Sequence, residues 1–166
     1  TLSSAWVNDL DGMIEAMIEF LDTSGALSVA MSQMGDFIGG LGCSMFRERL
    51  TRKCMNSFIC RTDRPFTFIG RINEDVNTYV WRASRGELMF TVADVSLNQI
   101  DTQQNSGGMT TFYLDGGTYL KSFYTVMINP SSVKIGTIGS GHVRFHHNVN
   151  WELCAPKIIS SKFRKE

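Results

Sequence analysis

Residues 66–81 decide the fold, and they read Phe-Thr-Phe-Ile-Gly-Arg-Ile-Asn-Glu-Asp-Val-Asn-Thr-Tyr-Val-Trp. The apolar run 66–69 is typical of a short strand, which Gly70 ends. Apolar residues after position 75 recur at the spacing of one helix face, so a helix is expected there, with Asn73 as its N-cap. The stretch therefore predicts a strand, a break and a helix.

Two adjacent carboxylates, Glu74 and Asp75, fall in the first turn of this expected helix. The free N–H groups and the dipole of a helix N-terminus favour ionised carboxylates there. A strand that delivers such a pair to the edge of a sheet can hold a catalytic base or a metal ligand. The alternative is that both acids only complement the dipole of a surface helix.

The segments before this stretch continue the α/β pattern. Residues 9–22 have the periodicity of an amphipathic helix, and residues 26–31 form a short apolar run expected to be a buried strand. Four glycines within residues 35–42 predict a loop whose backbone approaches another group closely, although the spacing matches no phosphate-binding motif. A strand is expected over 56–61, followed by a turn at 63–65.

The segments after it contain one more strand, a helix and a hairpin. Residues 88–93 predict a strand, and residues 98–111 predict a polar loop. Asp115-Gly116-Gly117 indicates a tight turn before a helix capped by Thr118, which would carry Lys121. Residues 133–138 and 142–145 predict a β-hairpin, with His146 and His147 where its second strand closes. The alternative is that Lys121 is a solvated lysine, which is the more common state of a lysine on a helix.

Composition excludes several classes of protein. The chain has 166 residues, 43% hydrophobic and 19% charged, and zero formal net charge, which is typical of one globular domain. No apolar run is long enough to span a membrane. The four cysteines lack metal-binding spacing, so we expect them to be reduced thiols in a cytoplasmic protein. Residues 47–64 concentrate positive charge, which fits a phosphate-bearing partner or a solvated face. The DNA-binding candidates in it are Arg47, Arg49, Arg52 and Lys53.

Several motifs together resemble a known family. Asn-Glu-Asp-Val-Asn-Thr-Tyr-Val at 73–80 resembles the acidic-pair motif of GT-A glycosyltransferases, and the order of glycine loop, acidic pair and histidine is the order of those enzymes. Gly-Gly-Met-Thr at 107–110, Gly-Thr-Tyr-Leu-Lys-Ser-Phe-Tyr-Thr-Val-Met at 117–127 and Arg-Phe-His-His at 144–147 are similar to the phage TET-associated glycosyltransferases, relatives of the base J glucosyltransferase.

This resemblance implies a nucleotide-sugar-dependent enzyme with a GT-A-like mixed sheet flanked by helices. It would transfer a hexose or pentose, from a donor expected to be UDP-linked, to 5-hydroxymethylpyrimidine in DNA in the cytoplasm of a phage-infected bacterium. The acidic pair would supply the catalytic base, and His146 or His147 would bind Mn²⁺ or Mg²⁺. The implied substrate-binding residues are Gly39, Gly40, Arg71, Gly108, Asp115, Thr118 and Lys121.

One departure from the family pattern concerns its Asp-x-Asp metal motif. The upstream candidate, Asp9-Leu10-Asp11, lies at the start of an amphipathic helix, so we interpret it as a cap. We therefore expect residues 1–166 to form a single domain, the acceptor-side part of a longer GT-A domain whose nucleotide-binding strands precede Thr1. The alternative is a non-catalytic GT-A-like domain that binds nucleic acid or protein, because a fold alone does not prove chemistry.

Geometry separates the members of each candidate pair. Glu74 and Asp75 lie about 100° apart around a helix, so they cannot both face one point equally, and the second acid of the family motif is the base. On a strand, His146 shares a polar face with Arg144, whereas His147 shares an apolar face with Phe145. That parity favours His146 as the metal ligand if the strand extends beyond Phe145.

Overall fold

The computed structural model describes residues 5–33, 42, 43, 57–98, 110–139, 141 and 143–154, with only the backbone for residues 110–118. Its elements follow the chain in the order α1 (Leu10–Ser24), β1 (Ser28–Gln33), β2 (Phe58–Ile59), α3 (Glu74–Ala83), β3 (Met89–Leu97), α4 (Thr110–Ile128), β4 (Val133–Ile138), β5 (Arg144–Val149) and α5 (Trp151–Cys154). None of the described helices combines the length and apolar character needed to span a bilayer.

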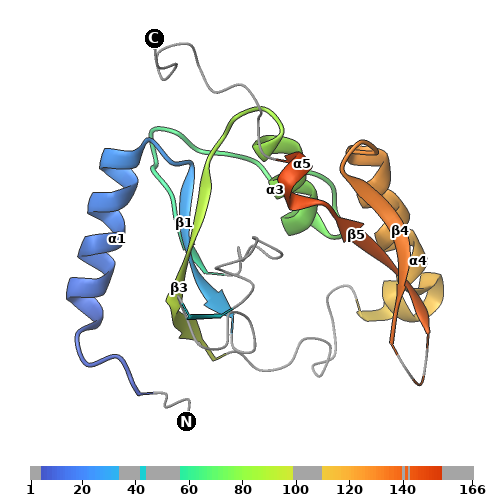
Figure 1. Cartoon of the computed structure of the whole chain (residues 1–166), viewed down its shortest axis with the longest axis horizontal. Helices are drawn as coiled ribbons and strands as arrows, with labels where there is room; N and C mark the ends of the chain where they lie inside the picture. The colour runs from blue at the N-terminus through green and yellow to red at the C-terminus, as the bar shows by residue number, and fades with distance from the viewer. Residues whose placement is uncertain are drawn as a thin grey trace.

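A three-stranded mixed sheet occupies one side of the molecule (Figure 1), with β1 between β2 and β3. β1 runs antiparallel to β2 and parallel to β3, pairing Ser28 with Met89. A parallel partner requires a crossover connection, and α3 lies within that connection. The expected α/β class with a mixed sheet flanked by helices is confirmed.

α1 lies alongside this sheet, and its cap explains where it begins. The Asp9 carboxylate accepts a hydrogen bond of 2.9 Å from the N–H of Gly12, and Gly25 ends the helix in the left-handed conformation. The interpretation of Asp9-Leu10-Asp11 as a capping feature is therefore confirmed. Met17 and Leu21 are buried against Val29 of β1, which fixes the apolar face of the helix. The strand expected over 26–31 is present two residues later.

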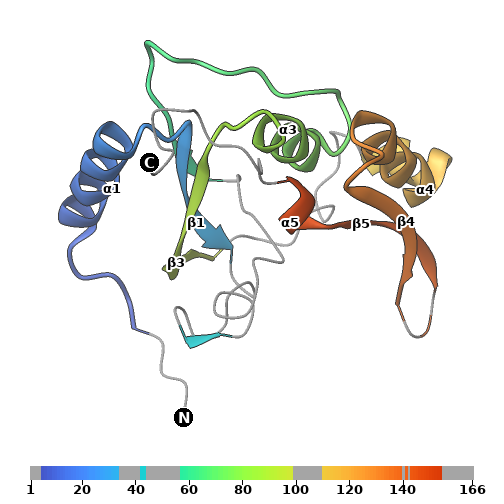
Figure 2. The same ribbon diagram turned by 45° about the horizontal axis from the view of Figure 1, so that its top comes forward.

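The β4–β5 hairpin forms a second, separate antiparallel ladder, packed against α4. In both ribbon views α3 lies between the three-stranded sheet and this hairpin (Figures 1 and 2). Tyr79 of α3 packs into the apolar cluster beside the sheet, whereas Val80 packs against Val133 of β4. Trp151 contacts both clusters, and its ring meets that of Tyr79 edge-on at 6.2 Å. α3 thus lies between the two parts of the core and packs against both.

The strand expected over residues 66–69 is wrong, because this segment is irregular and joins β2 to α3. Its backbone bonds to side chains of α3 instead of a strand: the N–H of Ile69 donates to Thr78 Oγ1 at 2.9 Å, and its carbonyl accepts from Asn77 Nδ2 at 3.2 Å. The apolar side chains serve packing, since Phe66 and Phe68 both contact the ring of Phe58.

The turn expected at Asp115-Gly116-Gly117, with Thr118 as a cap, is also wrong. The backbone of α4 is helical from Thr110 onward, through both glycines. Glycine costs a helix only about 1 kcal/mol relative to alanine, and tertiary packing outweighs such local terms. Here the packing comes from later turns, where Ser122 and Thr125 are buried.

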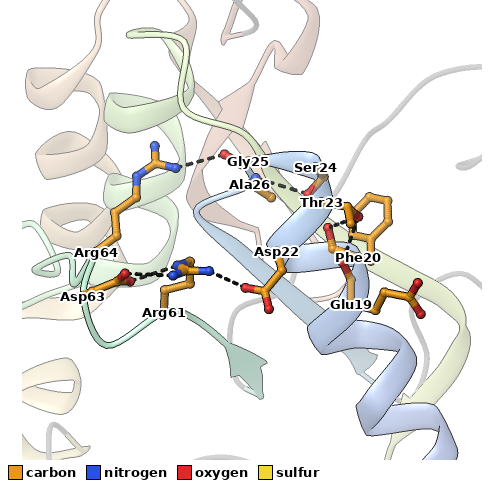
Figure 3. Close-up of polar contacts among 10 residues, drawn as sticks. All are labelled: Glu19, Phe20, Asp22, Thr23, Ser24, Gly25, Ala26, Arg61, Asp63 and Arg64. Atoms are coloured by element: carbon orange, nitrogen blue, oxygen red, sulfur yellow. Dashed lines mark hydrogen bonds and ion pairs between the residues drawn. The ribbon is translucent and has the colours of Figure 1, made fainter.

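The connection that follows β2 is fastened to the C-terminal end of α1 (Figure 3). The Arg61 guanidinium pairs with Asp22 of α1 and, at 2.8 Å, with Asp63. Arg64 donates to the carbonyl of Gly25 at 2.9 Å, next to the helix C-cap. The hydrogen bond from Arg61 lowers the pKa of Asp63, and the carboxylates of Asp63 and Asp22 raise the pKa of Arg61. These exposed contacts fix the direction in which the chain leaves β2.

Candidate functional site

The acidic pair lies where the sequence predicts it, in the first turn of α3. Glu74 is exposed and Asp75 is partly buried, so the two carboxylates have different surroundings despite being neighbours. Successive helical residues diverge by about 100°, which accounts for this difference. Arg71, exposed on the connection before α3, lies two residues ahead of Asn73.

Asn73 is at the expected N-cap position but does not cap the helix with its side chain, which corrects that detail of the prediction. Its backbone is left-handed, with φ 55° and ψ 35°, and the side chain is only 4% exposed. The amide points away from α3: Nδ2 donates to Thr125 Oγ1 of α4 at 2.6 Å and lies 3.5 Å from His147 Nε2 of β5. One side chain therefore joins the start of α3 to two elements far along the chain.

Gly70 provides a second close approach between the same connection and α4. Its φ is +83°, and a Cβ built there would lie 2.5 Å from Tyr124 Cε1. Only glycine fits both that conformation and that space. The start of α3 is thus held against α4 by two contacts, at Gly70, four residues before Glu74, and at Asn73, directly before it.

The two histidines lie inside β5, because the strand continues to Val149 instead of ending near Phe145 as expected. The strand condition of the parity argument is therefore met, but the two rings lie closer together than side chains on opposite faces of a strand, so parity alone does not separate them. His147 shares its face with Phe145, whose ring packs on Phe123 of α4 at 6.4 Å, so this face points toward α4. His147 is buried at 8% exposure and His146 is half-buried, with ring centroids 4.4 Å apart.

His147 is a neutral base at physiological pH. Three causes together lower its pKa from 6.5 to about 4: burial is the largest, followed by the neighbouring positive groups His146 and Lys121. Its Nδ1 is buried and makes no hydrogen bond within the described part of the chain. Lys121 is thus close enough to His147 to affect it electrostatically, and both belong to the region around Asn73.

The structure brings together part of the predicted site. The Asn73 amide joins Thr125 of α4 and approaches His147 of β5, and Lys121 of α4 acts electrostatically on His147. Glu74 and Asp75 follow Asn73 directly in the chain. Asp115 and Thr118 lie on α4 upstream of Lys121, in the segment whose side chains are not described. The remaining candidates lie outside the described residues: Gly39, Gly40, Gly108, Arg47, Arg49, Arg52 and Lys53.

The sequence interpretation missed Thr125 and the bridging role of Asn73. A signal for both was present, because Thr125 interrupts the apolar residues of its helix and asparagine is among the few residue types that tolerate a left-handed backbone. A buried hydroxyl and a buried amide each require a hydrogen-bond partner, but the sequence does not show which two groups pair.

The expected divalent metal requires a set of ligands. Across residues 5–33, 57–98, 119–139 and 143–154 no group of three histidine, cysteine or carboxylate side chains lies close enough to hold an ion. Chemically, the described residues offer a partly buried carboxylate at a helix N-terminus, a neutral imidazole and an ammonium group. That set suits removal of a proton from a hydroxyl beside a bound anion.

Comparison with known proteins identifies the family. No curated protein and no solved structure matches the chain significantly. The model of the TET-associated glycosyltransferases matches residues 2–108, which include α1, the sheet and the acidic pair, and the match ends before α4. Because this match covers more than half of the sequence and includes the helix that carries Glu74 and Asp75, the chain belongs to the TET-associated glycosyltransferase family.

Proposed function

We propose that this glycosyltransferase moves a sugar from a nucleotide sugar, UDP-linked, to the hydroxymethyl group of a modified pyrimidine in DNA. The observation that carries the proposal is the acidic pair in the first turn of α3, inside the segment that matches the family. Its natural setting is the cytoplasm of a phage-infected bacterium, where hydroxymethylated DNA and nucleotide sugars meet.

Asp75 is the base of the proposed reaction. The acceptor hydroxyl oxygen forms a bond to the anomeric carbon of the sugar while its proton passes to the Asp75 carboxylate. The bond from that carbon to the phosphate oxygen breaks, and the nucleoside diphosphate leaves with the electron pair. Glu74, which is exposed, orients the acceptor.

The leaving diphosphate carries charge that must be neutralised. Lys121 is the proposed cation for this role, because it acts electrostatically on His147, next to Asn73. We further propose that a divalent ion, Mn²⁺ or Mg²⁺, supplies Lewis-acid neutralisation when bound, with His146 or His147 among its ligands.

The acceptor base must leave the duplex or be presented single-stranded, because a stacked base is unreachable. Arg47, Arg49, Arg52 and Lys53 are the proposed phosphate contacts that hold the strand during this step.

The test uses the full-length protein with hydroxymethylcytosine DNA, a panel of nucleotide sugars and Mn²⁺, read by the mass of the DNA. We expect a gain of one hexose or pentose per modified base, and none on unmodified cytosine DNA. Asp75→Asn should lower turnover by roughly 10²–10⁴-fold, the usual loss when a general base is removed. Asp11→Asn, the same change in the first turn of α1, is the matched control and should keep full activity.

Two outcomes contradict parts of this proposal. If Asp75→Asn keeps wild-type turnover while Glu74→Gln abolishes it, the two acids exchange roles. If no donor gives a mass gain while the protein binds hydroxymethylated DNA in preference to unmodified DNA, the chain is a binding module and the enzymatic proposal is wrong.

A further inference from the structure

Asn73 occupies a conformation that few residue types accept, and the acidic pair follows it directly. Among the described residues it is the one non-glycine residue with positive φ. A left-handed backbone costs most L-residues roughly 1–2 kcal/mol, and asparagine less. Its carbonyl accepts the hydrogen bond of 2.9 Å from the N–H of Asn77, so this conformation sets the direction in which α3 begins.

The hydroxyl of Thr125 identifies which end of the Asn73 amide faces it. A hydroxyl carries one hydrogen, and that of Thr125 donates to the carbonyl of Lys121 at 3.3 Å. Thr125 must therefore accept from Asn73 at 2.6 Å, and only the nitrogen of the amide can donate. The hydrogen-bond network thus fixes which end of the Asn73 amide is the nitrogen and which is the oxygen, a choice that the shape of the amide alone leaves open.

The same nitrogen has a second hydrogen, and His147 Nε2 lies 3.5 Å away. A donor facing a neutral imidazole nitrogen requires the lone pair on that nitrogen, so the ring hydrogen belongs on Nδ1. His147 Nδ1 would then carry the ring hydrogen as a buried N–H, for which the described residues offer no acceptor. Asn73 thereby determines which ring nitrogen of His147 carries the hydrogen and can donate.

We propose that Asn73 is a positioning residue that anchors the acidic pair to α4 and β5 and sets the tautomer of His147. The consequence for the reaction rests on the proposed function. The consequence for the tautomer does not, because it follows from Thr125, Asn73 and His147 alone. A metal ion bound at Nδ1 of His147 would need the opposite tautomer and a rotated Asn73 amide.

The first test observes the His147 ring in the full chain, labelled with ¹⁵N-histidine, by NMR at neutral pH. We expect the wild type to show the hydrogen on Nδ1. Asn73→Gly keeps the left-handed backbone and removes the amide, so His147 should change to the other tautomer or a mixture, while His146 keeps its pattern. An unchanged His147 in Asn73→Gly, or a hydrogen on Nε2 in the wild type, overturns the proposal.

Thr125 supplies a matched pair of variants. Thr125→Val removes the acceptor and leaves the shape of the side chain, whereas Thr125→Ser keeps the hydroxyl. We expect the His147 pattern to change in Thr125→Val and to return in Thr125→Ser. A change of equal size in both variants would indicate general loosening of α4 and count against a directed hydrogen bond.

The second test measures turnover on hydroxymethylated DNA. Loss of the anchor displaces the base without removing a substrate contact, so Asn73→Gly should lower kcat by about 10²-fold and leave KM for DNA near its wild-type value. If the kcat of Asn73→Gly equals that of the wild type, the positioning role of Asn73 is wrong. If the wild type itself shows no transfer, the proposed function fails, and the NMR result alone decides the inference.

Discussion

His147 makes the stability of this protein depend on pH, because burial and two neighbouring positive groups oppose protonation of its ring. In the folded protein its pKa is about 4, whereas an unfolded chain restores the ordinary value near 6.5. Between these values the unfolded state binds more protons than the folded state. The contribution of His147 is therefore complete above about pH 6.5 and is lost as the pH falls toward 4.

We predict that this effect reaches at most about 3 kcal/mol in the free energy of unfolding. Urea unfolding of the wild type at pH 4.5, 5.5, 6.5 and 7.5 should give a slope that His147→Gln lacks. His146→Gln is the matched control on the neighbouring, half-buried ring and should keep most of the slope. Parallel curves for the wild type and His147→Gln would contradict the assignment.

The position of Asn73 before a helix could be predicted from its residue type, but the direction of its side chain could not. Asparagine is common at N-caps because its side chain bonds to free helix N–H groups, and that local rule gave the right position. The actual partners, Thr125 and His147, lie on elements that follow much later in the chain. Local patterns carry no information about which distant hydroxyl will be buried beside an amide.

At the scale of elements, Gly70 is the residue at which the irregular connection before α3 comes close to α4. Gly70→Ala combines a disfavoured positive φ with a Cβ 2.5 Å from Tyr124 Cε1. We predict a loss of about 1–3 kcal/mol in the free energy of unfolding, measured by urea titration. Gly141→Ala is the matched control, because a Cβ there meets no atom within 4 Å. Equal stability of the two variants would show that the connection moves freely.

Elements with a strong apolar periodicity, or with clear capping and turn residues at their ends, were predictable. Elements decided by long-range contacts were not. α1 and β4 follow from their apolar spacing and bounding residues, and α3 follows from the apolar face after Asp75. The run 66–69 has strand-like composition, but its backbone bonds are taken by Thr78 and Asn77. Asp115-Gly116-Gly117 has turn-like composition, but packing of later turns keeps α4 helical.

At the scale of the whole molecule, Trp151 joins the two parts of the core. It contacts the cluster of Leu27 and Met89 beside the sheet and the cluster of Val133 and Cys154 beside the hairpin. Removing this ring should separate the clusters on both sides of α3. The two parts are therefore expected to unfold together in the wild type.

We predict that Trp151→Ala lowers the free energy of unfolding by about 3 kcal/mol and that probes of the two parts then no longer coincide. Thermal unfolding followed by NMR signals of Val29 and Val133 measures this directly. Trp6→Ala is the control, since Trp6 is 88% exposed and its loss should change stability by less than about 0.5 kcal/mol. Coincident transitions in Trp151→Ala would show that α3 alone couples the parts.

The parallel ladder between β1 and β3 also sets the order in which the chain can fold. Ser28 pairs with Met89, so β2, α3 and all the chain between them must be made before this ladder can close. Closing such a long loop is slow, because its entropy is lost before the pairing compensates for it. During synthesis β1 therefore emerges without its parallel partner, and its backbone edge toward β3 stays unpaired until the ribosome has released Leu97.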